Sequence, residues 1–341
     1  MTRTVATPLR ISPTIARLSR ALARIGRALL LPLAAVVALG TPLSAQRAAR
    51  SAAPSTPAEA PARVDRALQA RLEALVRGFH GNVGVYVRNL RTGATAEIDA
   101  DSVFPTASMI KVPILLTLFD QAERGAVKLD AVVPFPDTLH YRYGEASDVV
   151  GYMAPGDSLP VREVAFLMLT ISDNFAALWL QGMVGGGTSV NEWLAAHGFR
   201  DTRVNSRTPG REAARSVYGW GQTTPREIAS ALVMIRQGRA VSPRASEEMY
   251  RLLTASFWRN EALSQIPPTV QAASKQGFVD RSRSEVLLVN APSGDYVLAI
   301  ITRNQADESY AESNEGYRLI RAVSRAVYQH FEPRDPWRPT H

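Results

Sequence analysis

A serine and a lysine three positions apart are the residues of this chain best suited to covalent chemistry. Ser108 opens and Lys111 closes a Ser-Met-Ile-Lys segment at the start of an apolar run, and residues three apart share one helical face. The chain has only three lysines against 36 arginines. An arginine stays protonated, whereas a buried lysine can lose its proton, so Lys111 is a candidate base for a Ser108 nucleophile. A helix cap followed by a surface lysine would have the same spacing.

A second polar segment, Ser172-Asp173-Asn174, interrupts two apolar stretches. Buried polar groups need hydrogen-bond partners. Ser172 could relay a proton to a leaving nitrogen, Asn174 could hold a substrate amide, and Asp173 could brace the loop. Because Ser, Asp and Asn are all common helix N-caps, a purely structural role stays open.

A third segment, Lys275-Gln276-Gly277-Phe278, ends a strand pattern. A strand lysine beside a cleft would attract a substrate carboxylate, and Gly277 would let another backbone approach closely. The N–H groups of Ser108 and Phe278 could together form an oxyanion hole. An exposed strand lysine without a function would show the same local pattern.

The three motifs, in this order and spacing, resemble the class A β-lactamases and the penicillin-binding proteins. The resemblance covers about residues 64–331 and includes the Thr-Thr-Pro segment at 223–225. It implies a serine β-lactamase-like hydrolase that opens β-lactam rings through an acyl-enzyme on Ser108. Lys111 would be the base and Ser172 the proton donor. The substrate would be bound by Asn174, Lys275, Gln276, Gly277 and Phe278.

The loop before the Thr-Thr-Pro segment departs from the family pattern. Class A enzymes carry there a Glu that activates the water releasing the acyl group, and counting back about 17 residues from Pro225 places it at Thr208. Glu212 lies one helical turn later. Glu212 could act as the catalytic base in a shifted loop, or it could pair with a loop arginine such as Arg211 and do no chemistry.

A second departure is Gln276, where the family usually has Thr or Ser, so the substrate range is open; Arg281 or Arg283 could add positive charge. The five histidines show no metal-ligand spacing, and we expect no metal and no cofactor.

Two alternatives to a β-lactamase remain open. One is a D-Ala-D-Ala peptidase acting on a peptidoglycan stem peptide. The other is a protein that binds β-lactams or peptidoglycan, with deacylation impaired because Thr208 replaces the loop Glu.

The net charge of +8 arises mostly in the first 45 residues, which contain six arginines and no acid. The remainder is nearly neutral and has no basic stripe of the kind that binds nucleic acid. An Arg-rich start followed by a short apolar run predicts a signal peptide over 1–45. A flexible linker over 46–63 and one domain over 64–334 follow. We therefore expect a periplasmic or secreted monomer, without disulfides because it lacks cysteine, and without stable membrane insertion after cleavage.

Hydrophobic periodicity predicts an α+β fold of the α/β-sandwich type. Helices are expected near 64–77, 108–124, 161–169, 173–184, 188–197, 225–237, 243–254 and 314–331. Strands are expected at 83–87, 94–98, 270–278, 285–290 and 295–302. Strands from the two ends of the chain would form one antiparallel sheet flanked by helices. An all-helical subdomain would lie beside the sheet, with the active site in the cleft between them.

Overall fold

The computed structural model describes residues 60–139, 141, 148–154 and 156–340, so the predicted signal peptide and most of the predicted linker lie outside the described residues. The α-helices are α1 (Arg66–Val76), α2 (Lys111–Glu123), α3 (Val161–Thr170), α4 (Asn174–Met183), α5 (Gly186–Ala196), α6 (Glu212–Tyr218), α7 (Pro225–Arg236), α8 (Pro243–Thr254) and α9 (Glu315–Phe331). The strands are β1 (Arg63–Val64), β2 (Asn82–Asn89), β3 (Ala94–Ile98), β4 (Phe104–Pro105), β5 (Val132–Pro134), β6 (Ser158–Pro160), β7 (Arg203–Val204), β8 (Gly221–Thr223), β9 (Ala272–Val279), β10 (Ser282–Val289) and β11 (Tyr296–Arg303).

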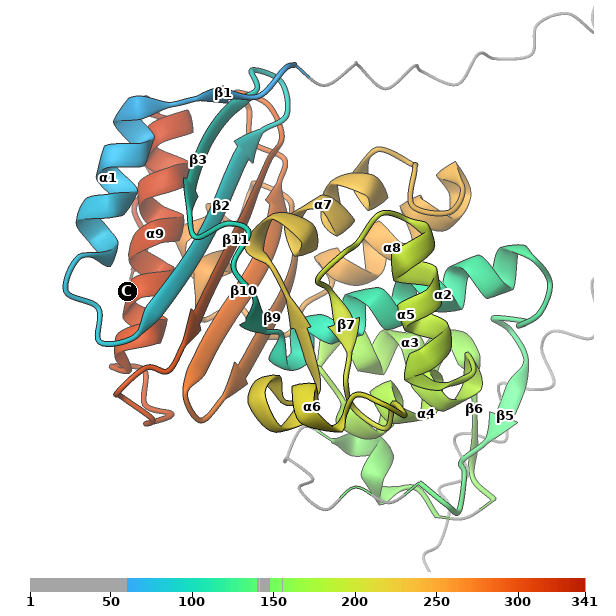
Figure 1. Cartoon of the computed structure of the whole chain (residues 1–341). Helices are drawn as coiled ribbons and strands as arrows, with labels where there is room; N and C mark the ends of the chain where they lie inside the picture. Colours follow the sequence, from blue (N-terminus) through green and yellow to red (C-terminus); the bar gives the residue numbers. More distant parts are fainter. Residues whose placement is uncertain (1–59, 140, 142–147, 155, 341) are drawn as a thin grey trace, which may run out of the picture. The chain divides into compact units, whose positions relative to one another are not determined.

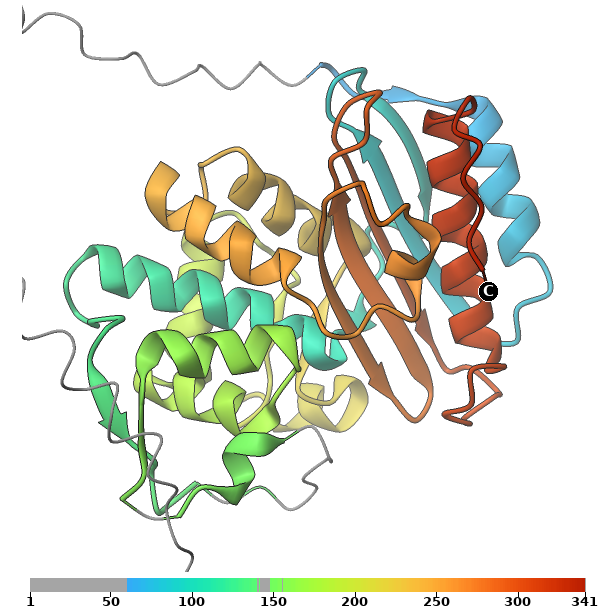
Figure 2. The same cartoon turned by 180° about the vertical axis from the view of Figure 1, so that it is seen from behind.

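The main sheet joins strands from both ends of the chain, as the sequence predicted. Its order is β1-β3-β2-β11-β10-β9, antiparallel throughout except for the short parallel pair β1–β3. The central pair β2–β11 places Tyr86 opposite Ala299, residues more than half the chain apart. Helices α1 and α9 cover one face of this sheet, and the helical region with α7 lies on the other face (Figures 1 and 2).

Successive side chains of each strand point to opposite faces of the sheet, where they pack into two separate hydrophobic cores. Val85 and Val87 of β2 pack with Leu298 of β11 against α1 and α9. On the other face, Tyr86 and Ala299 join the core of the helical region. Both faces are thus covered, which is why β10 and β11 are buried along almost their whole length.

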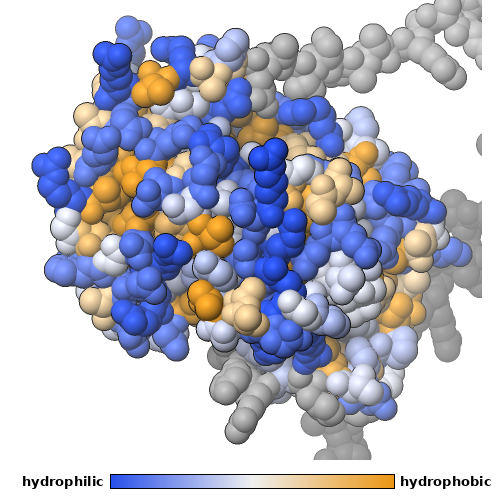
Figure 3. All heavy atoms as spheres, in the orientation of Figure 1, coloured by the Kyte–Doolittle hydropathy of each residue, from blue (hydrophilic) through white to orange (hydrophobic). Residues whose placement is uncertain are grey.

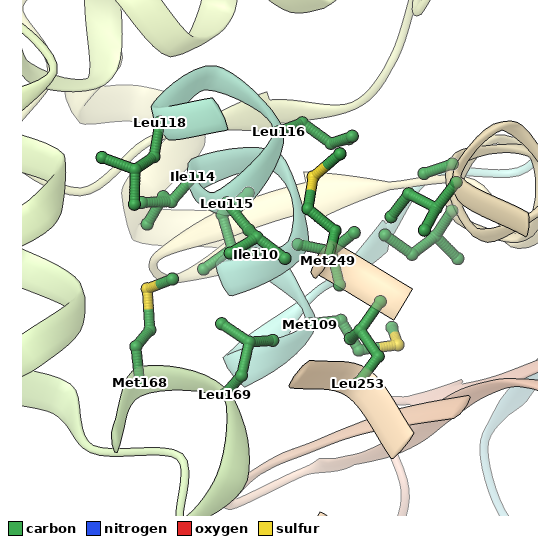
Figure 4. Close-up of a cluster of buried hydrophobic side chains, with 14 of the residues drawn as sticks. Met109, Ile110, Ile114, Leu115, Leu116, Leu118, Met168, Leu169, Met249 and Leu253 are labelled. Carbon is green, nitrogen blue, oxygen red and sulfur yellow. The ribbon is translucent and has the colours of Figure 1, made fainter. Parts of the chain in front are cut away.

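Helix α2 forms the centre of the helical region, and every residue from Lys111 to Phe119 is buried. The 3₁₀ turn Ala107–Ile110 (η2) leads directly into it. Figure 4 shows the apolar side chains that surround this segment, drawn from η2, α2, α3 and α8; they include Met109, Ile114, Met168 and Met249. Tight packing on all sides fixes the position of the turn that carries Ser108.

Some local predictions were wrong. Val64 was assigned to the first helix but lies in β1, because Asp65 caps α1 by accepting the N–H of Leu68 at 3.0 Å. Arg63, assigned to the linker, pairs with Ala94 in the same strand. The short sheet β4-β8-β7 and helix α6 were not predicted.

No helix among the described residues is long and apolar enough to cross a bilayer. On the face of the molecule drawn in Figure 3, hydrophilic residues predominate and apolar residues lie in patches among them.

Candidate active site

Ser108 and Lys111 lie in contact at the junction of η2 and α2. The Nζ atom of Lys111 is 3.0 Å from the Oγ atom of Ser108. Lys111 is fully buried, whereas Ser108 is only half-buried, so the hydroxyl faces an accessible space and the amine does not. Ala107, which precedes the serine, has a φ of +43°, a left-handed backbone conformation that residues other than glycine rarely adopt. Such outliers are common at functional sites.

The Ser172–Asn174 segment connects α3 to α4 and also has a left-handed residue, Ser172, with φ +66°. Asp173 caps α4 by accepting the N–H of Ala176 at 2.8 Å, and it accepts the N–H of Val150 at 2.9 Å. Burial raises the pKa of Asp173, and these two hydrogen bonds oppose the rise. Asp173 therefore braces the segment internally, in the manner that the sequence suggested.

The hydroxyl of Ser172 lies between two buried amines. Nζ of Lys111 and Nζ of Lys275 each donate to Ser172 Oγ at 3.0 Å. Both lysines are fully buried, so neither is the surface residue that the sequence left open. The three predicted motifs thus meet at one hydroxyl group.

Oxygen atoms crowd the amine of Lys111. It contacts Ser108 Oγ, Ser172 Oγ, the backbone oxygen of Ser172, and Oδ1 of Asn174 at 2.8 Å. A protonated lysine has three hydrogens and a neutral one has two, so the amine cannot donate fully to all four oxygens at once. A neutral Lys111 that donates to the backbone oxygen of Ser172 and to Asn174 Oδ1 would direct its lone pair at the hydroxyls, an arrangement suited to taking up a proton from a serine.

Strand β9 is the edge strand of the sheet and supplies Lys275, Gln276, Gly277 and Phe278. The amine of Lys275 donates to the backbone oxygen of Gln276 at 2.9 Å and to its side-chain oxygen at 3.2 Å. A Cβ atom on Gly277 would lie 2.8 Å from the backbone nitrogen of Ser108. Only glycine therefore allows β9 to pack this closely against the turn that carries the serine. Phe278 is half-buried, and its ring meets that of Tyr310 edge-on at 5.8 Å.

The loop before β8 provides no carboxylate at the position of Thr208. Thr208 is buried, and its hydroxyl donates to the backbone oxygen of Ser206 at 3.0 Å. Glu212 is exposed at the start of α6, where its carboxylate accepts the N–H of Gly210 at 3.2 Å. Arg211 donates to Asn205 and Gln222 at 2.9 and 2.6 Å. The surroundings of Glu212 are those of an acidic residue that stabilises a helix N-terminus.

A family model described as the beta-lactamase enzyme family matches residues 67–331 of the chain. The chain belongs to this family. A beta-lactamase of Streptomyces fradiae is 27% identical over 293 residues, covering 85% of this chain and 95% of the relative. The solved structure of PBP-A superposes with a TM-score of 0.71 at 29% identity, over 81% of this chain and 99% of PBP-A. A beta-lactamase structure from Sphaerobacter thermophilus has a TM-score of 0.69 at 24% identity, over 79% and 98%, and shows the shared fold.

The family fold brings together most of the predicted site residues and separates others. Ser108, Lys111, Ser172, Asn174, Lys275 and Gln276 form one connected set of contacts. Arg283, considered as an extra charge for the substrate, is fully buried between the rings of Tyr310 and Tyr317 and donates to backbone oxygens. Arg281 contacts Glu308 at 3.4 Å.

Sequence reasoning missed Asp148, a buried carboxylate that contacts Asn174 through both the backbone and the side chain. In the sequence it follows Glu145-Ala146-Ser147 and precedes Val149-Val150, and no motif distinguishes it there. No group of three or more His, Cys, Asp or Glu residues in the described part of the chain is arranged to hold a metal ion.

Proposed function

We propose that the protein opens β-lactam rings by forming an acyl-enzyme on Ser108, and that it releases the acyl group slowly. The observation that carries this proposal is the pair of 3.0 Å contacts from Lys111 Nζ to the hydroxyls of Ser108 and Ser172. One amine thus lies within proton-transfer distance of both the attacking oxygen and the oxygen that would protonate the leaving nitrogen.

The acylation step balances with these groups alone. Ser108 Oγ attacks the lactam carbonyl carbon while its proton passes to neutral Lys111, and the carbon–nitrogen bond of the ring breaks. Ser172 gives its proton to the ring nitrogen and recovers one from Lys111. Ser172 is suited to this role because its oxygen accepts from Lys111 and Lys275, which leaves its own hydrogen available to donate.

Substrate binding is assigned to β9 and to Asn174. A buried cation at Lys275 favours a substrate carboxylate, and the side-chain oxygen of Gln276 holds that amine in place. The backbone N–H groups of Ser108 and Phe278 are the proposed oxyanion donors, since β9 packs against η2 at Gly277. Asn174 would present its amide to the substrate.

We expect slow release of the acyl group because of the residues in the loop before β8. Thr208 offers no carboxylate to activate a water molecule, and Glu212 is exposed and engaged with the backbone of Gly210. The geometry favours a role without chemistry for Glu212, but one in which its carboxylate accepts from the backbone of Gly210, while Arg211 donates to Asn205 and Gln222. A single-residue variant of PBP-A, 28% identical to this chain, has been determined as an acyl-enzyme complex with penicillin G. That relative supports acylation as the step to expect here.

The test is an intact-mass time course of the purified protein mixed with excess penicillin G, with Ser108→Ala as the control. An adduct of one penicillin that forms on the wild type, is absent from the variant and persists for many minutes supports the proposal. A transient adduct with rapid loss of penicillin would retain acylation and overturn slow release. No adduct and no loss of penicillin would overturn the proposed function.

A peptidase acting on peptides that end in D-Ala-D-Ala is the second candidate, favoured by the absence of a carboxylate at Thr208 together with the similarity to PBP-A. The same Ser108, Lys111 and Ser172 would serve it. Release of D-alanine from a stem peptide by the wild type, and not by Ser108→Ala, would establish it.

We also propose that the protein is exported to the periplasm or the exterior and is a monomer there. N-terminal sequencing of the secreted chain would test export, and its size in solution would test the monomer.

A further inference from the structure

Asp148 is a buried carboxylate clamped onto Asn174 from a different part of the chain. It is 2% exposed and lies just before the 3₁₀ turn Val149–Tyr152, 26 residues from Asn174. One carboxylate oxygen accepts the backbone N–H of Asn174 at 2.6 Å, and the other accepts its side-chain amide Nδ2 at 3.2 Å. Such charge-assisted hydrogen bonds are stronger than neutral ones.

This clamp decides which way the amide of Asn174 faces. An ionised carboxylate can only accept, so Asp148 requires the NH₂ group of Asn174 on its side. The amide oxygen is then directed at the amine of Lys111, 2.8 Å away. In the opposite orientation, oxygen would face oxygen at Asp148, and NH₂ would face the amine of Lys111.

The two segments hold one another in register. Asp173 accepts the N–H of Val150, while Asp148 accepts the N–H of Asn174, so each segment binds the backbone of the other. Asp148 is thus linked to the buried amine of Lys111 through the side chain of Asn174.

We propose that Asp148 is a positioning residue for acylation: it fixes the amide of Asn174 so that Asn174 Oδ1 holds Lys111 against Ser108. This inference rests on the proposed acylation of Ser108. Asp148 does not touch the reacting atoms and acts through the contacts Asp148–Asn174–Lys111–Ser108.

The first variant is Asp148→Asn, which keeps the size of the side chain but carries both an acceptor and a donor, so that Asn174 can turn over. Labelling with a fluorescent penicillin over a range of concentrations separates the initial binding constant from the acylation rate constant. We expect the acylation rate constant to fall by about tenfold or more, as for loss of a charge-assisted hydrogen bond. The matched control is Asp65→Asn, which removes a carboxylate that caps α1 outside the site, and we expect it to acylate at the wild-type rate.

The second variant exchanges the two side chains, Asp148→Asn with Asn174→Asp. The amide at position 148 can then accept the backbone N–H of residue 174 and donate to the new carboxylate, whose other oxygen accepts from Lys111. A carboxylate at position 174 also favours the protonated form of Lys111, so we expect the exchange to restore most of the acylation rate constant only when the pH is raised. It should leave initial binding weaker than in the wild type, because position 174 no longer has an N–H for the substrate. A residue needed only for folding would not give this separation of the two constants.

The outcomes distinguish this inference from the proposed function. If the wild type is not acylated, the proposed function fails and this inference fails with it. If the wild type is acylated and Asp148→Asn reacts at the same rate, the positioning role is overturned and the proposed function stands. If Asp148→Asn does not fold, the exchanged variant decides: acylation that approaches the wild-type rate as the pH is raised supports the role, and a folded exchanged variant that is not acylated at any pH tested overturns it.

Discussion

Thr208 and Gly187 are packed so closely that a Cβ atom on Gly187 would lie 1.8 Å from the hydroxyl oxygen of Thr208. Gly187 lies in the first turn of α5, and Thr208 lies in the loop before β8, where counting back from Pro225 predicts the family's water-activating Glu. The contact anchors that loop to the helical region through a small side chain.

Gly187→Ala is therefore expected to destabilise the fold by about 1–3 kcal/mol, because the added methyl group overlaps Thr208. Urea denaturation measures this. The matched control is Gly182→Ala in α4, where a Cβ atom would meet nothing within 4 Å; there the greater helix propensity of alanine should leave stability unchanged or raise it. Equal effects of the two substitutions would contradict the steric account.

Lys111→Ala is expected to slow labelling of Ser108 by a fluorescent penicillin about 100-fold or more, because the base within 3.0 Å of the nucleophile is removed. Lys111→Arg should be nearly as slow, because it keeps a charge but cannot take up the proton. Gel fluorescence over time gives both rates. Fast labelling of the arginine variant would show that Lys111 acts through charge and not as a base.

Glu212→Gln is expected to leave the lifetime of the acyl-enzyme within about twofold of the wild type, because Glu212 is exposed and its carboxylate accepts the N–H of Gly210, a structural role that an amide oxygen can also fill. The decay of the adduct in intact-mass spectra measures the lifetime. A much longer-lived adduct, with acylation intact, would identify Glu212 as the residue that activates the releasing water.

Glu285 makes stability depend on pH. It is fully buried in β10, and burial raises the pKa of its carboxyl from 4.5 to about 7. The folded state therefore holds a proton that the unfolded chain has lost, so this group's stabilising contribution is complete below pH 4.5 and is lost as the pH rises through 7. The loss amounts to about 3 kcal/mol.

Glu285→Gln should remove this dependence. The amide can still accept the N–H of Ala262 and donate to Ser274, the two groups that the carboxyl contacts at 2.7 and 2.6 Å. Urea midpoints between pH 5 and pH 8 should fall more steeply for the wild type than for the variant. Parallel curves would contradict a raised pKa at Glu285. The control is Glu247→Gln, an exposed residue paired with Arg251.

The sequence predicted the features that depend on local spacing. Ser108 and Lys111 are three residues apart at the start of a strongly periodic apolar segment, so the sequence predicted that their side chains share one helical face. The predicted antiparallel sheet is confirmed, since alternation in β2 and β11 reflects two buried faces. Helix α6 could not be predicted because none of its residues is buried, so it has no hydrophobic pattern. The contacts of Asp148 with Asn174 and of Thr208 with Gly187 join distant segments, and no local pattern encodes them.

Two residues of the site have left-handed conformations: Ala107, beside the proposed nucleophile Ser108, and Ser172, the proposed proton donor. Each is disfavoured by about 1 kcal/mol or more for a residue with a side chain, and tight packing of the surroundings maintains it. Glycine at either position would relieve that penalty, and at Ser172 it would also remove the hydroxyl. At Ser172, stability and reactivity therefore place opposite demands on the same residue. Variants selected for heat resistance alone should accumulate changes at these turns and lose acylation before they lose the fold.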